Sequence, residues 1–293
     1  MSERITVAAS GGRKLEVVLA GPADGRVLIF HNGTPAAGRL FAPHVAAGAE
    51  RGVRHVTYSR PGYAQSERDA GRTIADCAQD VSAIADALGA ERVLVIGASG
   101  GGPHALASAA LLGERVRATA TLGSVAPWDA EGLDWLAGMG QENLEEFGAA
   151  LAGEEQLRSY LESEGAQLAH ATGPELFAAL GDLVSEPDRA ALTGDYAEYL
   201  AGCVKAALEG GVWGWFDDDI AFTRPWGFGL GAIATPVTIW QGEQDRFVPS
   251  AHGQWLGQHV GSARLELRPE HGHLSLDLDA YGEVLDDLLA RAG

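Results

Sequence analysis

The chain has 293 residues, of which 46% are hydrophobic and 21% are charged, and its formal net charge at pH 7 is −19. The hydrophobic and charged fractions are ordinary for a globular protein, so they predict a sizeable core and exclude a disordered chain. The excess of 40 acidic over 21 basic residues works against nonspecific binding to nucleic acid or to anionic membranes. We therefore expect neither a nucleic-acid partner nor a membrane partner.

The two cysteines, Cys77 and Cys203, are far apart in the sequence and neither has the spacing of metal ligands. We interpret both as small buried side chains and predict neither a disulfide framework nor a metal site. The first residues include no apolar segment of signal-peptide length, and no run of about 18 apolar residues occurs in the chain. These features predict a cytoplasmic protein.

Strand and helix signals alternate over the first 126 residues. Two short strands flank Gly11-Gly12 and predict a hairpin, whereas continuous apolar runs farther on predict strands that are covered on both faces. Strands are predicted at 5–9, 15–20, 27–30, 53–58, 93–96 and 116–122, and helices at 40–50, 74–88 and 103–112. This alternation is typical of a mostly parallel sheet with helices on both faces.

The alternation stops at residue 127 and returns after residue 232. Between these positions, short helices rich in Ala, Leu and Glu are predicted at 143–152, 154–171, 174–184 and 195–209, followed by an aromatic loop from Trp213 to Phe228. Strands at 237–240 and 264–267 and helices at 251–260 and 277–290 follow. We therefore predict an α/β protein whose sheet of about eight strands is built from residues 1–126 and 233–293, with a helical cap inserted at 127–232.

The strongest chemical signal is Gly97-Ala98-Ser99-Gly100-Gly101, which follows a predicted buried strand and precedes a helix. This is the G-x-S-x-G pattern in the context that gives it meaning. The sharp turn leaves no room for side chains at 97 and 101, and it lifts the Ser99 hydroxyl out of the sheet. It also places the Gly100 N–H at a helix N-terminus, where it can donate to a developing oxyanion. Ser99 is therefore the candidate nucleophile.

A dinucleotide-binding loop is the alternative interpretation, because Gly100, Gly102 and Ala105 match G-x-G-x-x-A. That motif normally follows the first strand of its domain, and an acidic residue at the end of the next strand holds the ribose. Here the motif follows a late strand, and the next strand, 116–122, ends without an acid. We therefore favour the nucleophile turn and predict no cofactor.

A serine hydroxyl needs a base, and the base needs an orienting group. Asp245 lies on the loop after the strand at 237–240, at the edge of the sheet where sites form, and Glu243 is the competing acid. Two histidines follow the last strand. We favour His273 as the base, because it follows a glycine and precedes the final helix, and we interpret His271 as structural.

The chain resembles the α/β-hydrolase superfamily over essentially its full length, as a capped member with a serine nucleophile. The resemblance is carried by Asn32-Gly33-Thr34-Pro35, by 59–66, by the 97–101 turn and by the loops of Asp245 and Gly272-His273. It implies that Ser99, Asp245 and His273 form a catalytic triad. The block at 59–66 departs from the family pattern at Ser59 and Ala64, and we interpret it as loop architecture.

The resemblance also implies an oxyanion hole. The first N–H donor of this hole is Gly100. In this family the second donor is the third residue of an H-G-x-P loop, which is Thr34 here, and Asn32 stands where the family usually has histidine. Because His31 lies one residue upstream, Gly33 is the alternative donor.

The serine nucleophile limits the types of reaction that the site can catalyse. Family members that open epoxides or displace halide use a carboxylate at this position, whereas a hydroxyl suits acyl transfer. We therefore predict a carboxylesterase-like enzyme that cleaves an ester or related carbonyl bond of a small, largely apolar substrate through an acyl-enzyme. A proline-releasing aminopeptidase is the first alternative, which Gly100 and Thr34 count against. A non-hydrolytic family member (lyase, cofactor-free oxygenase or ligand-binding protein) is the second, and the complete triad disfavours it.

The predicted cap is rich in aromatic residues, most of which we expect to pack in its core. Trp213, Trp215 and Trp226 are expected to line an apolar pocket above Ser99. The run 217–219, three consecutive aspartates, is compatible with binding a cation or a substrate amine, and also with a solvated helix cap. The sequence predicts no oligomeric state.

Overall fold

The computed structural model describes residues 2–293 and contains one eight-stranded sheet with the strand order β1-β2-β4-β3-β5-β6-β7-β8. The predicted hairpin is present: β1 (Glu3–Ala8) pairs antiparallel with β2 (Lys14–Ala20), which runs antiparallel to β4 (Val53–Tyr58). All other neighbouring strands are parallel. The prediction of a mostly parallel sheet of about eight strands is confirmed.

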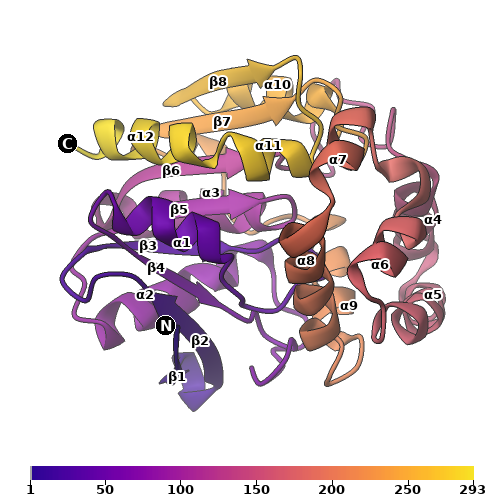
Figure 1. Ribbon diagram of the computed structural model, residues 1–293, viewed down its shortest axis with the longest axis horizontal. Helices are drawn as coiled ribbons and strands as arrows, with labels where there is room; N and C mark the ends of the chain where they lie inside the picture. Colours follow the sequence, from indigo (N-terminus) through magenta and orange to yellow (C-terminus); the bar gives the residue numbers. More distant parts are fainter. Residues whose placement is uncertain (1) are drawn as a thin grey trace.

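Helices cover both faces of this sheet (Figure 1). The remaining strands are β3 (Arg26–His31), β5 (Val93–Ala98), β6 (Val116–Leu122), β7 (Val237–Gly242) and β8 (Ala263–Arg268). The flanking helices are α1 (Ala42–Ala49), α2 (Cys77–Ala87), α3 (Gly101–Leu112), α10 (Ser250–His259), α11 (Leu274–Asp279) and α12 (Tyr281–Ala292).

The central strand β5 explains why its sequence is apolar at consecutive positions. Val93 and Val95 belong to the core on one face, which they share with residues of α2, α3 and α10. Leu94 and Ile96 belong to the core on the other face, which is closed by α12. Successive side chains of a strand point to opposite faces, so a strand buried on both faces needs an unbroken apolar run.

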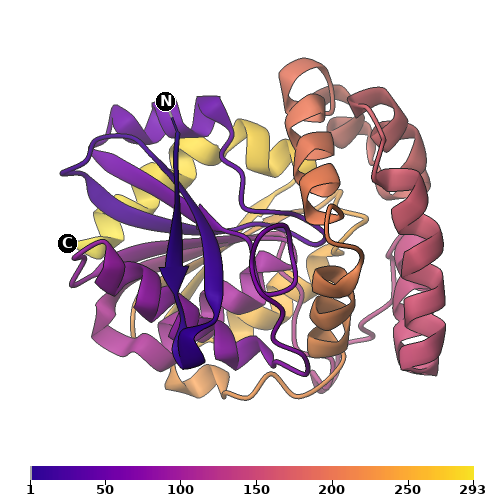
Figure 2. The same cartoon turned by 90° about the horizontal axis from the view of Figure 1, so that it is seen from below.

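Between β6 and β7 the described chain contains helices and loops but no strand. The helices are α4 (Gln141–Ala152), α5 (Glu154–Leu168), α6 (Gly173–Ala179), α7 (Glu186–Ala191), α8 (Gly194–Ala207) and α9 (Trp213–Phe222). We call α4–α9 the helical insertion. Figures 1 and 2 place it at one end of the sheet, the end toward which the arrows of the central parallel strands point. In parallel α/β proteins this carboxyl edge is where ligand sites form.

Two local predictions were wrong, and one helix was not predicted. The segment predicted as an aromatic loop contains helix α9, whose residues after Trp213 are all buried. A helix that is buried on all sides has no solvent-exposed polar face, and so it lacks the amphipathic period by which a sequence reveals a helix. The short helix α7 was not predicted, and the single helix expected at 277–290 is two helices, α11 and α12. Across residues 2–293, no helix has the length and apolar character to cross a bilayer.

Candidate active site

Ser99 occupies the turn between β5 and α3, with a φ of 52°. Its backbone N–H donates to the Leu122 carbonyl oxygen at 2.8 Å, which ties the turn to the neighbouring strand β6. A Cβ at Gly97 would collide with the Gly101 carbonyl, and a Cβ at Gly101 would collide with the His31 carbonyl. The two glycines are therefore required by close backbone approach, as the sequence predicts.

His273 and Asp245 lie on the loops after β8 and β7 and are joined by a hydrogen bond. His273 Nδ1 lies 2.6 Å from Asp245 Oδ2, and the backbone N–H groups of Phe247 and Val248 donate to Asp245 Oδ1 at 2.9 and 2.8 Å. Burial opposes the charged imidazole, but the neighbouring Asp245 outweighs it and raises the pKa of His273. A carboxylate held in this way fixes the tautomer that leaves Nε2 free to accept a proton.

Glu243 and His271, the alternative acid and base in the sequence, lie outside the cavity that contains Ser99 and His273. Glu243 is exposed, in contrast to the buried Asp245. His271 is half-buried, and its carbonyl accepts the Gln244 N–H at 3.0 Å, so it braces the loop that carries Asp245.

The histidine loop is held by Asp188, which belongs to α7 of the helical insertion. Its fully buried carboxylate accepts the backbone N–H groups of His273, Leu274 and Ser275 at 2.9, 2.7 and 2.9 Å. It thereby satisfies the unpaired N–H groups at the start of α11, which begins directly after His273. Nothing in the sequence points to this role, because α7 and the loop are joined only in three dimensions.

The Asn32–Thr34 loop after β3 lies beside Ser99 and is oriented by Arg60. The Arg60 guanidinium donates to the carbonyl oxygens of Asn32 and Gly33, the latter at 2.9 Å. In a trans peptide the C=O and the next N–H point in opposite directions. The Gly33 and Thr34 N–H groups are therefore turned away from Arg60. Both residues line the same cavity as Ser99, so both remain candidates for the second oxyanion donor.

Arg60 is in turn held by Asp218 of α9, inside a buried ion cluster. Asp218 also accepts hydrogen bonds from Arg72, at 2.6 Å, from the Tyr63 hydroxyl, at 2.9 Å, and from the Thr34 hydroxyl, at 2.7 Å. Burial opposes ionisation of Asp218, but the two guanidinium groups lower its pKa far below the usual range. The helical insertion is thus fastened to both candidate catalytic loops by one buried aspartate each.

The aspartate run 217–219 divides into three environments. Asp217 pairs with Arg68 at 2.8 Å, and Asp218 lies in the cluster just described. Asp219 has no cationic partner, and burial, together with Glu146 beside it, raises its pKa well above the usual value. The expectation of a solvated helix cap is wrong, because all three side chains are buried.

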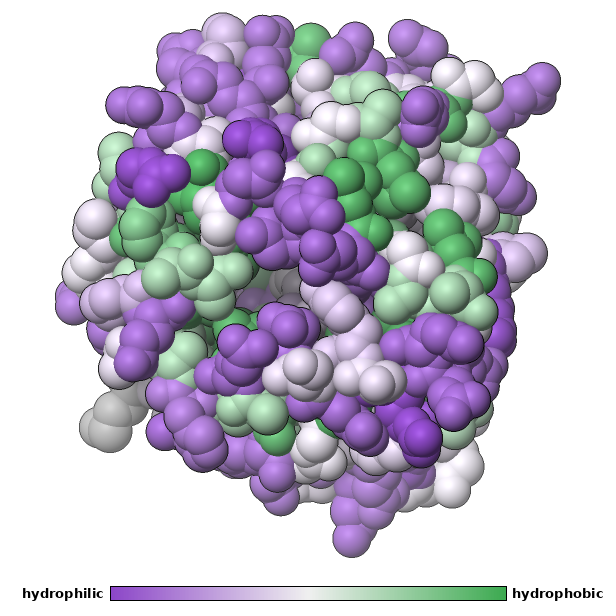
Figure 3. Space-filling view, turned by 90° about the vertical axis from the view of Figure 1, so that its right-hand side faces the viewer, coloured by the Kyte–Doolittle hydropathy of each residue, from purple (hydrophilic) through white to green (hydrophobic). Residues whose placement is uncertain are grey.

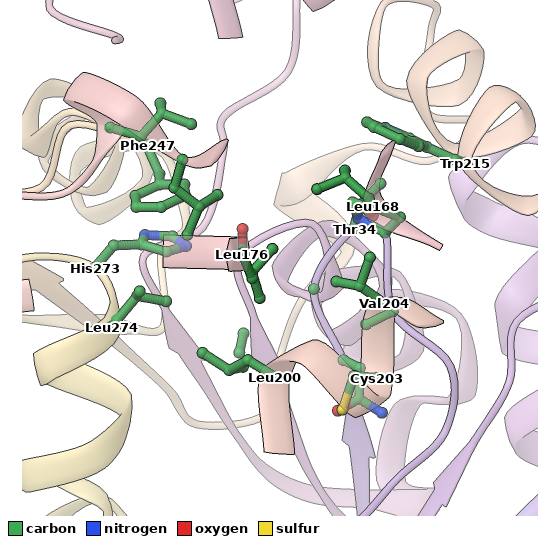
Figure 4. A pocket seen from close by; sticks show the side chains of 18 of the residues that line it. Thr34, Leu168, Leu176, Leu200, Cys203, Val204, Trp215, Phe247, His273 and Leu274 are labelled. Carbon is green, nitrogen blue, oxygen red and sulfur yellow. The ribbon is translucent and has the colours of Figure 1, made fainter. Parts of the chain in front are cut away.

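A cavity of about 220 Å³ opens beside Ser99 and His273, between the sheet edge and the helical insertion. The space-filling view of this end of the molecule shows a hollow near its centre (Figure 3). Aliphatic side chains, including Leu168, Leu176 and Leu200, form much of the wall, with Phe247 stacked on His273 (Figure 4). The wall is therefore largely apolar around the reactive groups.

Of the three tryptophans predicted to line this cavity, the structure places only Trp215 there. The predictions for the other two are corrected by their packing. The Arg68 guanidinium lies over the Trp213 ring, 4.0 Å from the centroid of that ring. Trp226 packs in the core beside Phe228. Cys203 lines the cavity wall, and both cysteines are buried free thiols. Within residues 2–293, no group of three or more His, Cys, Asp or Glu side chains has a metal-binding arrangement.

A curated relative from Variovorax paradoxus (strain S110), named "Putative carbamate hydrolase RutD", is 27% identical over 286 residues, covering 92% of this chain and 94% of the relative. Among solved structures, an alpha/beta hydrolase fold protein from Nakamurella multipartita is 23% identical, with a TM-score of 0.66 over 99% of this chain and 100% of that one. A hydrolase from Pseudomonas aeruginosa PA01 is 19% identical, with a TM-score of 0.71 over 98% of both chains.

At these identities the two solved structures are evidence for the fold alone. A family model described as the alpha/beta hydrolase fold matches residues 26–280. This match spans most of the chain and includes every candidate residue of the site. The chain therefore belongs to the α/β-hydrolase family.

Proposed function

We propose that this protein is a serine hydrolase that cleaves an ester or a related carbonyl bond of a small, largely apolar substrate. The observation that carries the proposal is the shared cavity: Ser99, on its strained turn, faces the same space as His273, whose other ring nitrogen is bonded to Asp245. The largely aliphatic wall supports the apolar substrate class. We further propose that the helical insertion acts as the cap over this site.

In the proposed reaction, Ser99 Oγ attacks the carbonyl carbon while His273 Nε2 accepts the hydroxyl proton. The N–H groups of Gly100 and of Thr34 or Gly33 donate to the tetrahedral oxyanion, each donor being worth about 3 kcal/mol in comparable sites. His273 returns the proton to the leaving group. Water then attacks the acyl-enzyme, with His273 accepting its proton and passing it to Ser99 Oγ. Asp245 stabilises the imidazolium in both halves of the reaction.

The test combines turnover of p-nitrophenyl acetate and butyrate with labelling by a fluorophosphonate probe. We expect wild-type protein to hydrolyse at least one ester and to be labelled. Ser99→Ala should lose labelling and several orders of magnitude in turnover, while its circular dichroism spectrum stays unchanged. Activity of Ser99→Ala near the wild-type level would refute the proposal.

The two histidines of the same loop offer a matched control. His273→Ala should abolish labelling, because the serine loses its base, whereas His271→Ala should retain it. Labelling without ester turnover would point to another electrophile, such as an amide or a C–C bond next to a carbonyl. Absence of both would support a non-hydrolytic family member.

Carbamates form the second candidate substrate class, because the name of the curated relative refers to carbamate hydrolysis. A carbamate carbonyl can be attacked by the same serine and its oxyanion held by the same donors. A p-nitrophenyl carbamate should therefore be included in the panel. Faster acylation by the carbamate than by the ester of equal chain length would favour this class.

A further inference from the structure

We propose that the cavity selects substrates carrying a cationic nitrogen on the part remote from the reacting carbonyl, and that it rejects substrates carrying a carboxylate there. This inference names the substrate class of the proposed hydrolase and therefore depends on that function. Its basis is one wall of the cavity, which we call the acidic wall: Glu142 and Glu146 from α4 and Glu164 from α5. Among residues 2–293, no lysine or arginine lines the cavity.

The acidic wall lacks the cations that balance the other carboxylates in this part of the molecule. Asp217 and Asp218, on the adjacent helix α9, are neutralised by Arg68 and by Arg60 and Arg72. Glu146 instead accepts a hydrogen bond from the neutral indole N–H of Trp215 at 2.8 Å. Glu146 is half-buried, and a carboxylate partly removed from water without a cation is costly unless it is protonated or a ligand supplies the charge.

Asp219 of α9, beside Glu146, is a further carboxylate whose charge no cation of residues 2–293 neutralises. Its side chain is fully buried and has no cationic partner among the described residues, and its carboxyl group shares a hydrogen bond with that of Glu146. A buried carboxyl pair of this kind holds a proton in place of a second negative charge. A bound cation at Glu146 would take over that role.

The acidic wall is separated from the reactive groups. Trp215, which marks the position of Glu146, and His273 lie on opposite sides of the cavity (Figure 4). A substrate whose carbonyl is at Ser99 therefore presents its far end to the acidic wall. The remaining carboxylate of the cavity, Asp277, lies on the His273 side and accepts a hydrogen bond from the Tyr196 hydroxyl at 2.7 Å. The apolar side chains between the two ends suit an aliphatic spacer.

A substrate whose far end carries a negative charge would be repelled by the same carboxylates. It would enter a cavity that contains several carboxylates, in a protein whose net charge is −19. Like charges in a site of low polarity repel strongly, and no guanidinium or ammonium group of the wall offsets them. The two halves of the proposal, selection of cations and rejection of anions, therefore have the same physical origin.

The groups that face Glu146 predict how this selectivity depends on pH. Trp215 and Asp219 of α9, Tyr160 and Glu164 of α5 and Glu142 of its own helix surround it. Burial raises the pKa of Glu146 to about 7. The preference for a cation should therefore grow as the pH rises through about 7, because Glu146 loses its proton over that range.

The experiment uses three series of p-nitrophenyl esters whose acyl chains end in tert-butyl, trimethylammonium or carboxylate groups, with two to five methylenes as spacer. The first two groups have the same shape and differ in charge. We expect kcat/KM for the best ammonium ester to exceed that of its tert-butyl counterpart by about tenfold or more, and the carboxylate ester to fall below it by a similar factor.

Variants on the same helices provide the controls. Glu146→Gln and Glu164→Gln should reduce severalfold the ratio of kcat/KM for the ammonium ester to kcat/KM for the tert-butyl ester, both measured on the same variant. Glu145→Gln and Glu162→Gln remove exposed carboxylates one position before Glu146 and two before Glu164, and they should leave the preference unchanged. Equal effects in both pairs would assign the preference to the general surface charge and overturn the proposal.

Failure of this inference is distinguishable from failure of the proposed function. Hydrolysis of the tert-butyl ester without any charge preference would overturn the inference and leave the hydrolase intact. If no ester is cleaved, the charge preference of the cavity can still be tested by measuring calorimetrically how tightly the matching N-methyl amides bind to the Ser99→Ala protein. Tighter binding of the ammonium amide than of the tert-butyl amide supports the acidic wall, and equal or weaker binding rejects it.

Discussion

Asp188 is the residue that links the helical insertion to the candidate base. Its carboxylate accepts three consecutive backbone N–H groups, including that of His273 itself, so the position of the imidazole depends on it. Its charge also contributes to the raised pKa of His273, after the larger effect of Asp245. Asp188 therefore influences both the geometry and the protonation of a residue 85 positions away.

Asp188→Asn should lower kcat for p-nitrophenyl butyrate by about 10- to 100-fold, because a misplaced base lies outside the reactive geometry. The sign of the pH effect follows from the charge. Removal of an anion lowers the pKa of His273, so the acid limb of the kcat/KM profile should move to lower pH.

Ser185→Ala is the matched control, because it removes one hydrogen bond to Asp188 and keeps the negative charge. Its acid limb should coincide with that of the wild type. A lower kcat in Asp188→Asn without any displacement of the acid limb would mean that Asp188 is only structural. That result would remove Asp188 from the electrostatics of the site.

At the level of elements, the loop after β3 and helix α9 are joined by the Arg60–Asp218 pair. The 59–66 block is predicted to be loop architecture, and its position in the structure gives it a further role. Arg60 turns two peptide planes so that their N–H groups face away from the guanidinium. A buried ion pair such as this one specifies geometry more than it adds stability, because desolvation offsets much of its Coulomb energy.

Arg60→Lys should lower kcat by about 10- to 100-fold with a smaller change in KM, because an ammonium group cannot bind Asp218 and both carbonyls at once. Arg72→Lys is the comparison variant: Arg72 shares Asp218 but donates to Gly214 and not to the Asn32–Thr34 loop. Its kcat should stay within about threefold of the wild type. Equal losses of kcat in the two variants, at equal melting temperature, would contradict a positioning role for Arg60.

At the scale of the whole molecule, buried histidines make the fold sensitive to acid. Burial lowers the pKa of His31 to about 3 and that of His55 and His252 to about 4. Their unfolded pKa is about 6.5, so between about pH 6.5 and 4 the unfolded chain binds protons that the folded chain does not. The free energy of unfolding therefore falls with falling pH, at up to about 1.4 kcal/mol per pH unit for each such histidine.

Urea unfolding followed by circular dichroism at pH 7.5, 6.5, 5.5 and 4.5 measures this slope. His252 and His259 lie on the same helix, the first buried and the second exposed. His252→Gln should make the slope shallower, while His259→Gln should leave it unchanged. A flat dependence between pH 6.5 and 4.5 would contradict neutral buried histidines.

Much of the fold and part of the candidate site could be predicted from local patterns. The strand at 53–58 and the strand at 116–122 have the predicted bounds, because both contain β-branched residues, which favour strands, within a short segment. The turn at Ser99 was predictable for a similar reason, since its two glycines are required by neighbours close in sequence and in the adjoining strand. The family pattern supplied the acid and the base, which the fold then brings together.

Helix α9 is an element that local sequence patterns could not predict. Its burial on all sides removed the helical period, and its two tryptophans looked equivalent in the sequence although only Trp215 reaches the cavity. A side chain's direction on a helix depends on what the helix packs against, and α9 packs against Tyr63 of a distant loop.

The amino-acid sequence by itself determined the sheet and the nucleophile turn, because these depend on residue spacing along one segment. It also offered the candidate Asp and His on the loops after two late strands, and the family resemblance implied their roles. Only the tertiary structure decided which carboxylates are neutralised by arginine, which one holds the histidine loop and which face the cavity without a cation. Those outcomes depend on contacts between residues as far apart as Arg60 and Asp218, separated by 158 positions. Burial and pairing of charge are properties of such contacts, and no local pattern encodes them.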